Sequence, residues 1–119
     1  MEKLIKQIET SGATFDQIAY ALNVSPRNLR YRIHSNDTHP ELRRRAEKLL
    51  NVIQIFHKEN ILYCWKYLDM KFKDIKGDEK SIVLLFRSKM SIGTLVSKAM
   101  KVAKDNIKNP QTWSSYLDE

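Results

Sequence analysis

Apolar residues in the first third of the chain recur at spacings of three and four, the period that places side chains on one face of an amphipathic helix. Two short helices are therefore predicted, the first over residues 2–9 and the second from Phe15 to Leu22. Ser11-Gly12 separates them, because glycine tolerates the backbone conformation found just past a helix end. Their apolar faces are formed by Leu4, Ile5 and Ile8 in the first helix and by Phe15, Ile18, Ala19 and Leu22 in the second.

The next residues have the composition of a tight turn followed by a third helix. Asn23 occupies the position where a left-handed backbone is needed, for which asparagine is the least costly residue after glycine. Ser25 is suited to cap the next helix, and Pro26 to its first turn, where a missing N–H costs nothing. Thr14 opens a T-x-x-Q capping box at the start of the preceding helix. These signals predict two helices joined by a turn within residues 14–34.

A stretch without glycine or proline runs from Glu41 to Lys76 and begins with a regular apolar pattern. Its first half alternates spacings of four and three, as in a coiled coil, and we call this set the 42–56 seam: Leu42, Ala46, Leu49, Ile53 and Phe56. The stripe moves to another helical face from Ile61 onward, so the chain is expected to bend or restart near residues 58–60. The seam is expected to pack either on the C-terminal helices or on a second copy of the chain.

Residues 67–86 fit two structures. Alternation of Leu68, Met70 and Phe72 with charged residues suits a strand, and residues 81–86 would then form its hairpin partner across Gly77-Asp78. The same residues also fit two helices, which the abundance of Lys, Leu, Met and Glu favours.

Residues 91–107 predict a helix with apolar residues along one side. An aromatic belt is interpreted as core, with a subunit interface as the alternative; it consists of Tyr63, Trp65, Tyr67, Met70 and Phe72.

These patterns predict a mainly α fold in two parts. Residues 1–38 are expected to form an N-terminal helix-turn-helix domain. Residues 39–119 are expected to form a long helix and a C-terminal helical region that serves oligomerisation. A length of 119 residues and an apolar content of 42% allow a core of this kind and exclude a disordered chain.

Arginine and lysine are used in different parts of the chain. The net charge is +7 and the sequence pI is about 9.6, which favours a polyanionic partner. Six of the seven arginines lie between Arg27 and Arg45, whereas the C-terminal half takes its positive charge mainly from lysine. Arginine forms forked hydrogen bonds with guanine edges or phosphates, and lysine acts as a point charge. The segment from Arg27 to Ile33 holds three arginines and no acid, unlike an ordinary solvated face.

The sequence ALNVSPRNLRYRI, residues 21–33, resembles the helix-turn-helix superfamily and most of all its Fis-type version. That version has an aliphatic residue after the turn position, a small polar cap, and a leucine that precedes a basic cluster ending in an aliphatic residue. The matching positions are Val24, Ser25, Leu29, Arg30 to Arg32, and Ile33. Ala19 stands at the close contact between the helices, where the superfamily has a small residue. Asn23 departs from the common glycine, and the resemblance covers about 20 residues.

Residues 11–50 also resemble the N-terminal domain of phage small terminase subunits. In that family a helix-turn-helix is followed by a His-Pro-acid-aliphatic start to a long oligomerising helix. The corresponding positions are His39, Pro40, Glu41 and Leu42. The aromatic residue at the centre of the family's recognition helix corresponds to Tyr31 at best, and nothing beyond Leu50 resembles the family.

Both resemblances imply that the third helix contacts double-stranded DNA. Base edges would be met by Arg27, Asn28, Arg30 and Tyr31. Phosphates would be held by Thr14, Ser25, Arg32, Arg43, Arg44 and Arg45. Two other interpretations stay open. The helix pair could be an ordinary helical hairpin with no role in DNA binding. The arginine triplet could be a solvated face beside Glu41 and Glu47, because a helix spreads three consecutive residues over about 200°.

Other chemistry has little support in the sequence. Cys64 is the single cysteine and lies in an apolar run, so it predicts a core residue, no intrachain disulfide and a reducing cytoplasm. The three histidines are not spaced as a metal site, and the three isolated glycines form no phosphate loop. No carboxylates are spaced as a catalytic pair. We therefore expect a binding protein rather than an enzyme, with no metal or cofactor, no signal peptide and no membrane span.

The expected function is that of a small transcriptional regulator of phage or bacterial type. It would bind DNA as a homodimer on a palindrome, because one recognition helix buries too little surface for strong specificity. The alternatives are a DNA-packaging adaptor of the small terminase kind and a protein-interaction module whose basic face docks an acidic partner. The mass of the assembly separates the first two, since a packaging adaptor would form a ring of about eight or more copies.

Overall fold

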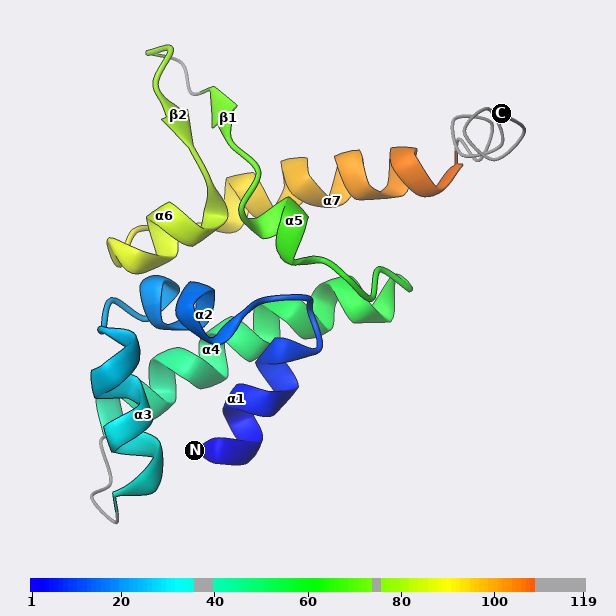
Figure 1. Cartoon of the computed structure of the whole chain (residues 1–119). Helices are drawn as coiled ribbons and strands as arrows, with labels where there is room; N and C mark the ends of the chain where they lie inside the picture. The colour runs from blue at the N-terminus through cyan, green and yellow to red at the C-terminus, as the bar shows by residue number, and fades with distance from the viewer. Residues whose placement is uncertain (36–39, 74–75, 109–119) are drawn as a thin grey trace, which may run out of the picture.

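The structure is a computed structural model that describes residues 1–35, 40–73 and 76–108. Helices form most of it, so the predicted mainly α fold is confirmed (Figure 1). Along the chain the elements are α1 (Glu2–Glu9), α2 (Phe15–Ala21), α3 (Pro26–His34), α4 (Pro40–Lys58), α5 (Trp65–Leu68), β1 (Phe72–Lys73), β2 (Glu79–Lys80), α6 (Ile82–Arg87) and α7 (Gly93–Lys108). His39, which belongs to the resemblance to small terminase subunits, lies outside the described residues.

The predicted caps and turn of the helix-turn-helix are confirmed. The Thr14 hydroxyl accepts a hydrogen bond from the Gln17 backbone N–H at 3.2 Å, and the Gln17 side chain accepts one from the Thr14 N–H at 2.8 Å. The Ser25 hydroxyl accepts the Asn28 N–H at 3.1 Å, and α3 starts at Pro26. Asn23 adopts a left-handed φ of 59°. Local side-chain chemistry therefore fixes where α2 and α3 begin.

The 42–56 seam is buried on a single face of α4, as its spacing predicts. Its partners lie largely within the N-terminal part of the same chain, because α4 packs against α1. The same hydrophobic cluster includes Ile8, Leu22 and Leu29 from the first three helices and Ile82 from α6. The core therefore crosses the division predicted at residue 38, and the seam is covered without a second copy of the chain.

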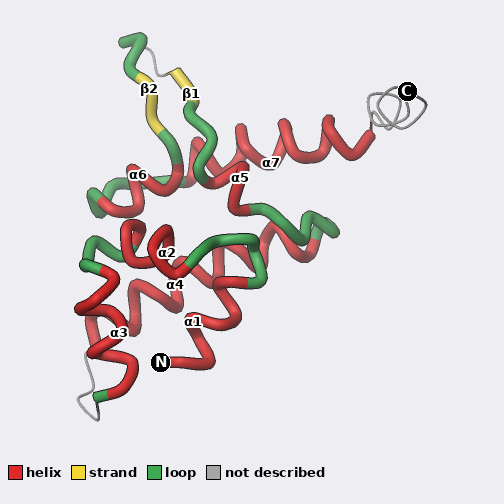
Figure 2. Tube along the Cα trace, in the orientation of Figure 1, coloured by secondary structure: helices red, strands yellow, loops and turns green. Residues whose placement is uncertain are grey.

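The helix preference for residues 67–86 is confirmed only at the two ends of this range, by α5 and α6, because the short antiparallel strands β1 and β2 pair between them. Phe72 pairs with Lys80, and Lys73 with Glu79. Figure 2 shows the two strands projecting from the helical body. Gly77, with a φ of 87°, lies in the connection and is a position that most side chains would strain. The proposed second strand over residues 81–86 is wrong, because the Ser81 hydroxyl accepts the Leu84 N–H at 3.0 Å and starts α6.

The break expected near residues 58–60 is confirmed. Asn60 has a φ of 62°, and the Ile61 N–H donates to the Phe56 carbonyl at 3.0 Å, which closes the end of α4. Beyond this turn the predicted long helix is reduced to α5, and α7 packs against it. Within α7, Ala99 and Ala103 are buried. The belt residues Trp65 and Tyr67 are core, and Tyr63 is exposed.

Cys64 is fully buried beside α5, as predicted for a core residue. Burial disfavours the thiolate and raises the pKa of this thiol to about 11. At pH 8 the folded protein should therefore hold only about 0.1% of this cysteine as thiolate. We expect a thiol-specific reagent such as DTNB to label native Cys64 slowly and urea-unfolded Cys64 within minutes. Rapid labelling of the native protein would contradict this burial.

Candidate nucleic-acid interface

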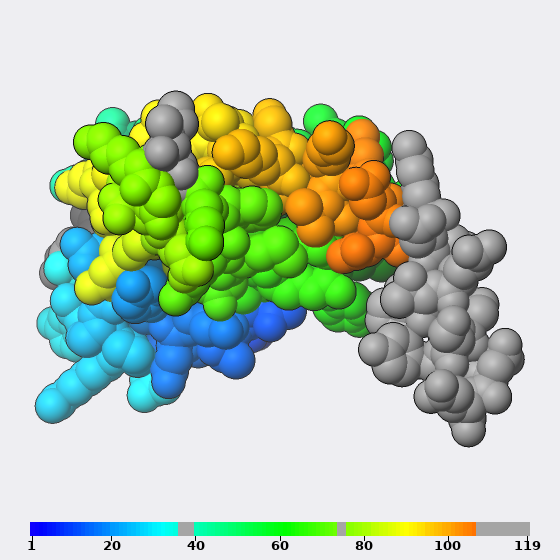
Figure 3. Space-filling model, turned by 90° about the horizontal axis from the view of Figure 1, so that it is seen from above, coloured from blue at the N-terminus to red at the C-terminus, as the bar shows by residue number. Residues whose placement is uncertain are grey.

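Helix α3 presents a polar, positively charged face to solvent. Leu29 is fully buried and Ile33 half-buried, so these two anchor the helix to the core. The four residues predicted to meet base edges are all exposed: Arg27, Asn28, Arg30 and Tyr31. The Tyr31 side chain is 66% exposed and lies one helical turn after Arg27, opposite Leu29. In the space-filling view, side chains of the turn and α3 project from one edge of the molecule (cyan in Figure 3).

Two of these side chains are held by neighbours. The Arg30 guanidinium lies over the Phe15 ring, 5.3 Å from its centroid, so the start of α2 supports it. Asn28 accepts a hydrogen bond through its Oδ1 from the Arg32 Nε at 3.2 Å. Arg32 is half-buried and faces the turn rather than the outer edge of α3. Arg32 therefore orients Asn28, and it also lies where a phosphate could approach.

Thr14 and Ser25 use their hydroxyl oxygens as acceptors in the helix caps. Both residues are exposed. Because a hydroxyl has one hydrogen to donate beyond the bonds that it accepts, each can still donate to a phosphate oxygen. Capping and phosphate contact are thus compatible at both positions, which lie at helix N-termini, where anions are favoured.

The arginine triplet is divided among three environments. Arg43 is exposed and pairs with Glu47, with 3.4 Å between the Nε and the carboxylate oxygen. Arg44 is exposed on the next helical position and lines a surface groove with Lys48. Arg45 is half-buried and turns towards α2 and α6. The spread expected of consecutive helical residues is therefore present, and the three have different roles.

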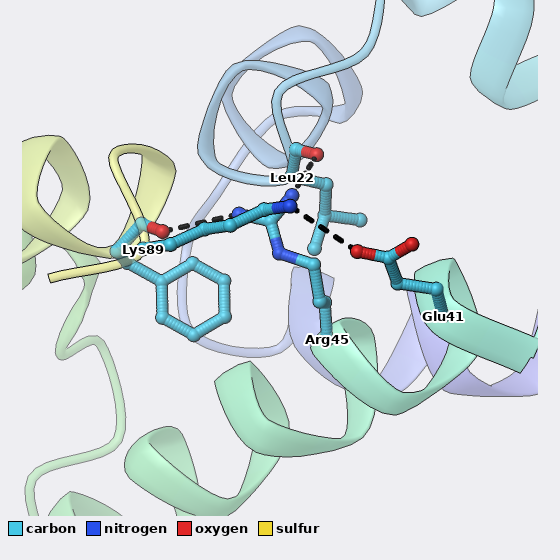
Figure 4. Close-up of polar contacts among 5 residues, drawn as sticks. Leu22, Glu41, Arg45 and Lys89 are labelled. Atoms are coloured by element: carbon cyan, nitrogen blue, oxygen red, sulfur yellow. Dashed lines mark hydrogen bonds and ion pairs between the residues drawn. The ribbon is translucent and has the colours of Figure 1, made fainter.

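Arg45 has a structural role that the sequence did not predict. It was expected to hold a phosphate, but its Nη1 donates to the Leu22 carbonyl at 2.8 Å and its Nη2 to the Phe86 carbonyl at 3.1 Å (Figure 4). Its guanidinium also lies over the Phe86 ring, 5.5 Å from the centroid. Carbonyls at helix C-terminal ends lack helical partners and carry partial negative charge. Arg45 supplies a donor to the Leu22 carbonyl and a second, charged donor to the Phe86 carbonyl, which also accepts the Lys89 N–H, and it joins the ends of α2 and α6 to α4.

A second structural arginine was missed by the sequence reasoning. Arg87 donates through Nη1 to the Tyr20 carbonyl at 2.6 Å, and its guanidinium lies 4.3 Å from the centroid of the Tyr20 ring. The two residues are 67 positions apart, so no local pattern signals the contact. Together Arg45 and Arg87 hold the last carbonyls of α2, directly before the turn into α3.

The turn after α6 repeats the turn after α2. The Asn23 and Val24 N–H groups donate to Tyr20 and Ala19 at 3.0 Å each; those of Lys89 and Met90 donate to Phe86 and Leu85 at 3.1 and 2.9 Å. Lys89, like Asn23, has a φ of 59°. This conformation sends the Lys89 side chain past Arg45 to Glu41, where Nζ and the carboxylate are 3.2 Å apart (Figure 4). The hydrogen bond and charge of Lys89 lower the pKa of Glu41.

Two further features of the described residues bear on function. Within residues 1–35, 40–73 and 76–108, no three His, Cys, Asp or Glu side chains are grouped so that they could hold a metal ion. No helix in this described part combines the length and the apolar character needed to cross a membrane. No protein-family model, no curated protein and no solved structure matches this chain.

Proposed function

We propose that the protein binds double-stranded DNA sequence-specifically through α3, as a small transcriptional regulator of phage or bacterial type that acts in a reducing cytoplasm. The observation that carries the proposal is the exposed face of α3. This face carries Arg27 and Arg30 and no acid, on a capped helix that follows a tight turn. A helix presented in this way can enter the major groove with its first residues at the base edges.

The geometry of α3 assigns base contacts and phosphate contacts to different residues of the proposed interface. Arg27 and Tyr31 form the outermost ridge of the helix and would lie deepest in the groove. Arg30 and Asn28 flank this ridge, each held by another side chain, which lowers the entropy lost when they meet a base. Thr14, Ser25, Arg32, Arg43 and Arg44 would contact phosphates around it.

A single helix contacts only half of a typical operator, so we propose a homodimer on a palindromic site. Selection of bound duplexes from a random pool tests this proposal with the full chain. A palindromic consensus is the expected result, and it should be lost with the double variant Arg27→Ala/Tyr31→Ala. No enrichment over the input pool would overturn sequence-specific binding. Light scattering tests assembly, since a ring of about eight or more copies would favour the packaging adaptor.

Replacing Arg30 with Ala should weaken binding to the selected site and relax the preference at one base pair. The reason is that a forked arginine–guanine contact contributes roughly 1–3 kcal/mol, or about five- to 150-fold in affinity. Fluorescence anisotropy on the selected duplex and on single-base variants measures both effects. An equal loss on specific and random duplexes would make Arg30 a phosphate contact instead.

The double variant Arg43→Ala/Arg44→Ala should lower affinity for all duplexes alike. If each arginine neutralises one phosphate, the slope of log affinity against log salt should fall by about two units. Lys98→Ala/Lys101→Ala is the matched control, because it removes two exposed positive charges from α7. A slope that is unchanged, or reduced equally by the control, would show that Arg43 and Arg44 are only solvated.

A further inference from the structure

A groove of about 640 Å³ lies between α4 and the turn that joins α6 to α7. One wall is polar and belongs to α4, with Arg44, Lys48 and Asn51 on successive turns. The opposite wall is mainly apolar and includes Phe86, Met90 and Ile92. The volume falls in the usual range for ligand-binding clefts of proteins.

The α4 wall carries positive charge that the described residues leave available. Arg44 and Lys48 are four residues apart, so both side chains project from the same face of α4. Both are exposed, and neither forms a hydrogen bond or a salt bridge within the described part of the chain, although the charge of Arg44 acts on Glu41 at the start of the same wall. Arg43, by contrast, lies outside the groove and is paired with Glu47.

The facing wall is apolar and partly accessible. Met90 is 53% exposed, which is high for a methionine, and Ile92 and Val52 are half-buried beside it. A flexible thioether side chain adapts to apolar partners of different shapes. The groove therefore offers two cations on one side and a soft apolar surface on the other.

We infer that this groove binds an acidic amphipathic peptide segment of a partner protein. Carboxylates spaced by one helical turn on the segment would pair with Arg44 and Lys48, and its apolar side chains would pack on Met90 and Ile92. Duplex DNA fits less well, because a phosphate backbone leaves the apolar wall uncovered.

The groove is connected to the candidate DNA interface. Arg45 and Lys89 line it, and they also line the neighbouring depression formed by Asn23, Val24 and Arg32. An occupant that contacts Lys89 or displaces Glu41 would act on the turn before α3. If the proposed function holds, peptide binding and DNA binding should therefore influence each other.

Fluorescence anisotropy with the full chain tests the inference. The probe is a fluorescein-labelled 15-residue helix-forming peptide with Glu at positions i and i+4 on one face and Leu and Phe on the other. We expect saturable binding to the wild-type chain, and roughly tenfold or greater weakening in Arg44→Glu/Lys48→Glu and in Met90→Asp. A Glu→Gln version of the peptide should also bind at least tenfold more weakly than the probe.

Control variants separate this site from the DNA interface. Arg43→Glu, which reverses a neighbouring charge outside the groove, and Arg27→Ala/Tyr31→Ala, on α3, should both retain the peptide. No saturable binding by the wild-type chain, or equal binding by Arg44→Glu/Lys48→Glu, would overturn the inference. So would a roughly tenfold or greater loss of random-duplex binding in Met90→Asp, which would assign the groove to DNA; this variant is used because Arg44 is also a proposed phosphate contact. A loss of self-association in Arg44→Glu/Lys48→Glu without peptide would assign it to a second copy. Loss of DNA binding alone in the α3 variant would leave the peptide site standing.

Discussion

Replacing Ile53 with Asp is expected to unfold the protein. Ile53 is fully buried in the middle of α4, within the single hydrophobic cluster. An unpaired carboxylate in such a site costs about 4 kcal/mol or more, which is a large share of the stability of a domain of this size. Circular dichroism should show loss of helix at 25 °C, or a melting temperature lowered by about 15 °C or more.

Ile55→Asp is the matched control for this experiment. Ile55 lies on the same helix two residues later, but it is 47% exposed, so its replacement should change stability far less. The sequence alone left open that the 42–56 seam joins two copies, in which case Ile53→Asp would yield a folded monomer. A folded, monomeric Ile53→Asp protein would restore that interpretation and contradict the packing of α4 described above.

Replacing Arg45 with Ala should have the second largest effect. The substitution leaves the Leu22 and Phe86 carbonyls without their charged donor, and it removes the contact with the Phe86 ring. We expect a loss of about 2–4 kcal/mol in the free energy of unfolding measured in urea. DNA binding should weaken on all duplexes, because the end of α2 that leads into α3 is no longer held.

Two substitutions separate this role from a phosphate contact. Arg44→Ala, at the adjacent exposed position, should lower the salt dependence of DNA binding and leave the free energy of unfolding nearly unchanged. Arg45→Lys should not restore stability, because one ammonium group lacks the planar fork that spans two carbonyls. If Arg45→Ala folds as stably as the wild-type chain but loses salt dependence, Arg45 contacts phosphate after all.

Features fixed by neighbouring residues were predictable from the sequence. The Thr14 and Ser25 caps, the left-handed Asn23 and the apolar faces of the first helices each depend on a few residues close in the chain. The exposed face of α3 followed from the burial of Leu29, because helical geometry then fixes where Arg27 and Tyr31 point.

Features fixed by distant contacts were not predictable. The position of Arg45 in the sequence matches that of its exposed neighbours, and only the approach of α6 shows that its partner is a carbonyl rather than a phosphate. Arg87 reaches Tyr20 across 67 positions. The hairpin of β1 and β2 was an alternative that the sequence did not favour, because helix propensity dominates its composition, while pairing and the Gly77 conformation decide its structure.

Arg45 also limits how this protein can be divided or engineered. A fragment that stops after α4 would keep α2, the turn and α3, together with the buried apolar face of α4. It would lack Phe86 and Arg87, and thus the contacts that tie the end of α2 to α6. The α2–turn–α3 segment, transplanted alone, would therefore bring the α3 side chains without the Arg45 and Arg87 contacts that hold the end of α2. A transferable unit must therefore still contain α6, so its residues come from two parts of the chain that are far apart in the sequence.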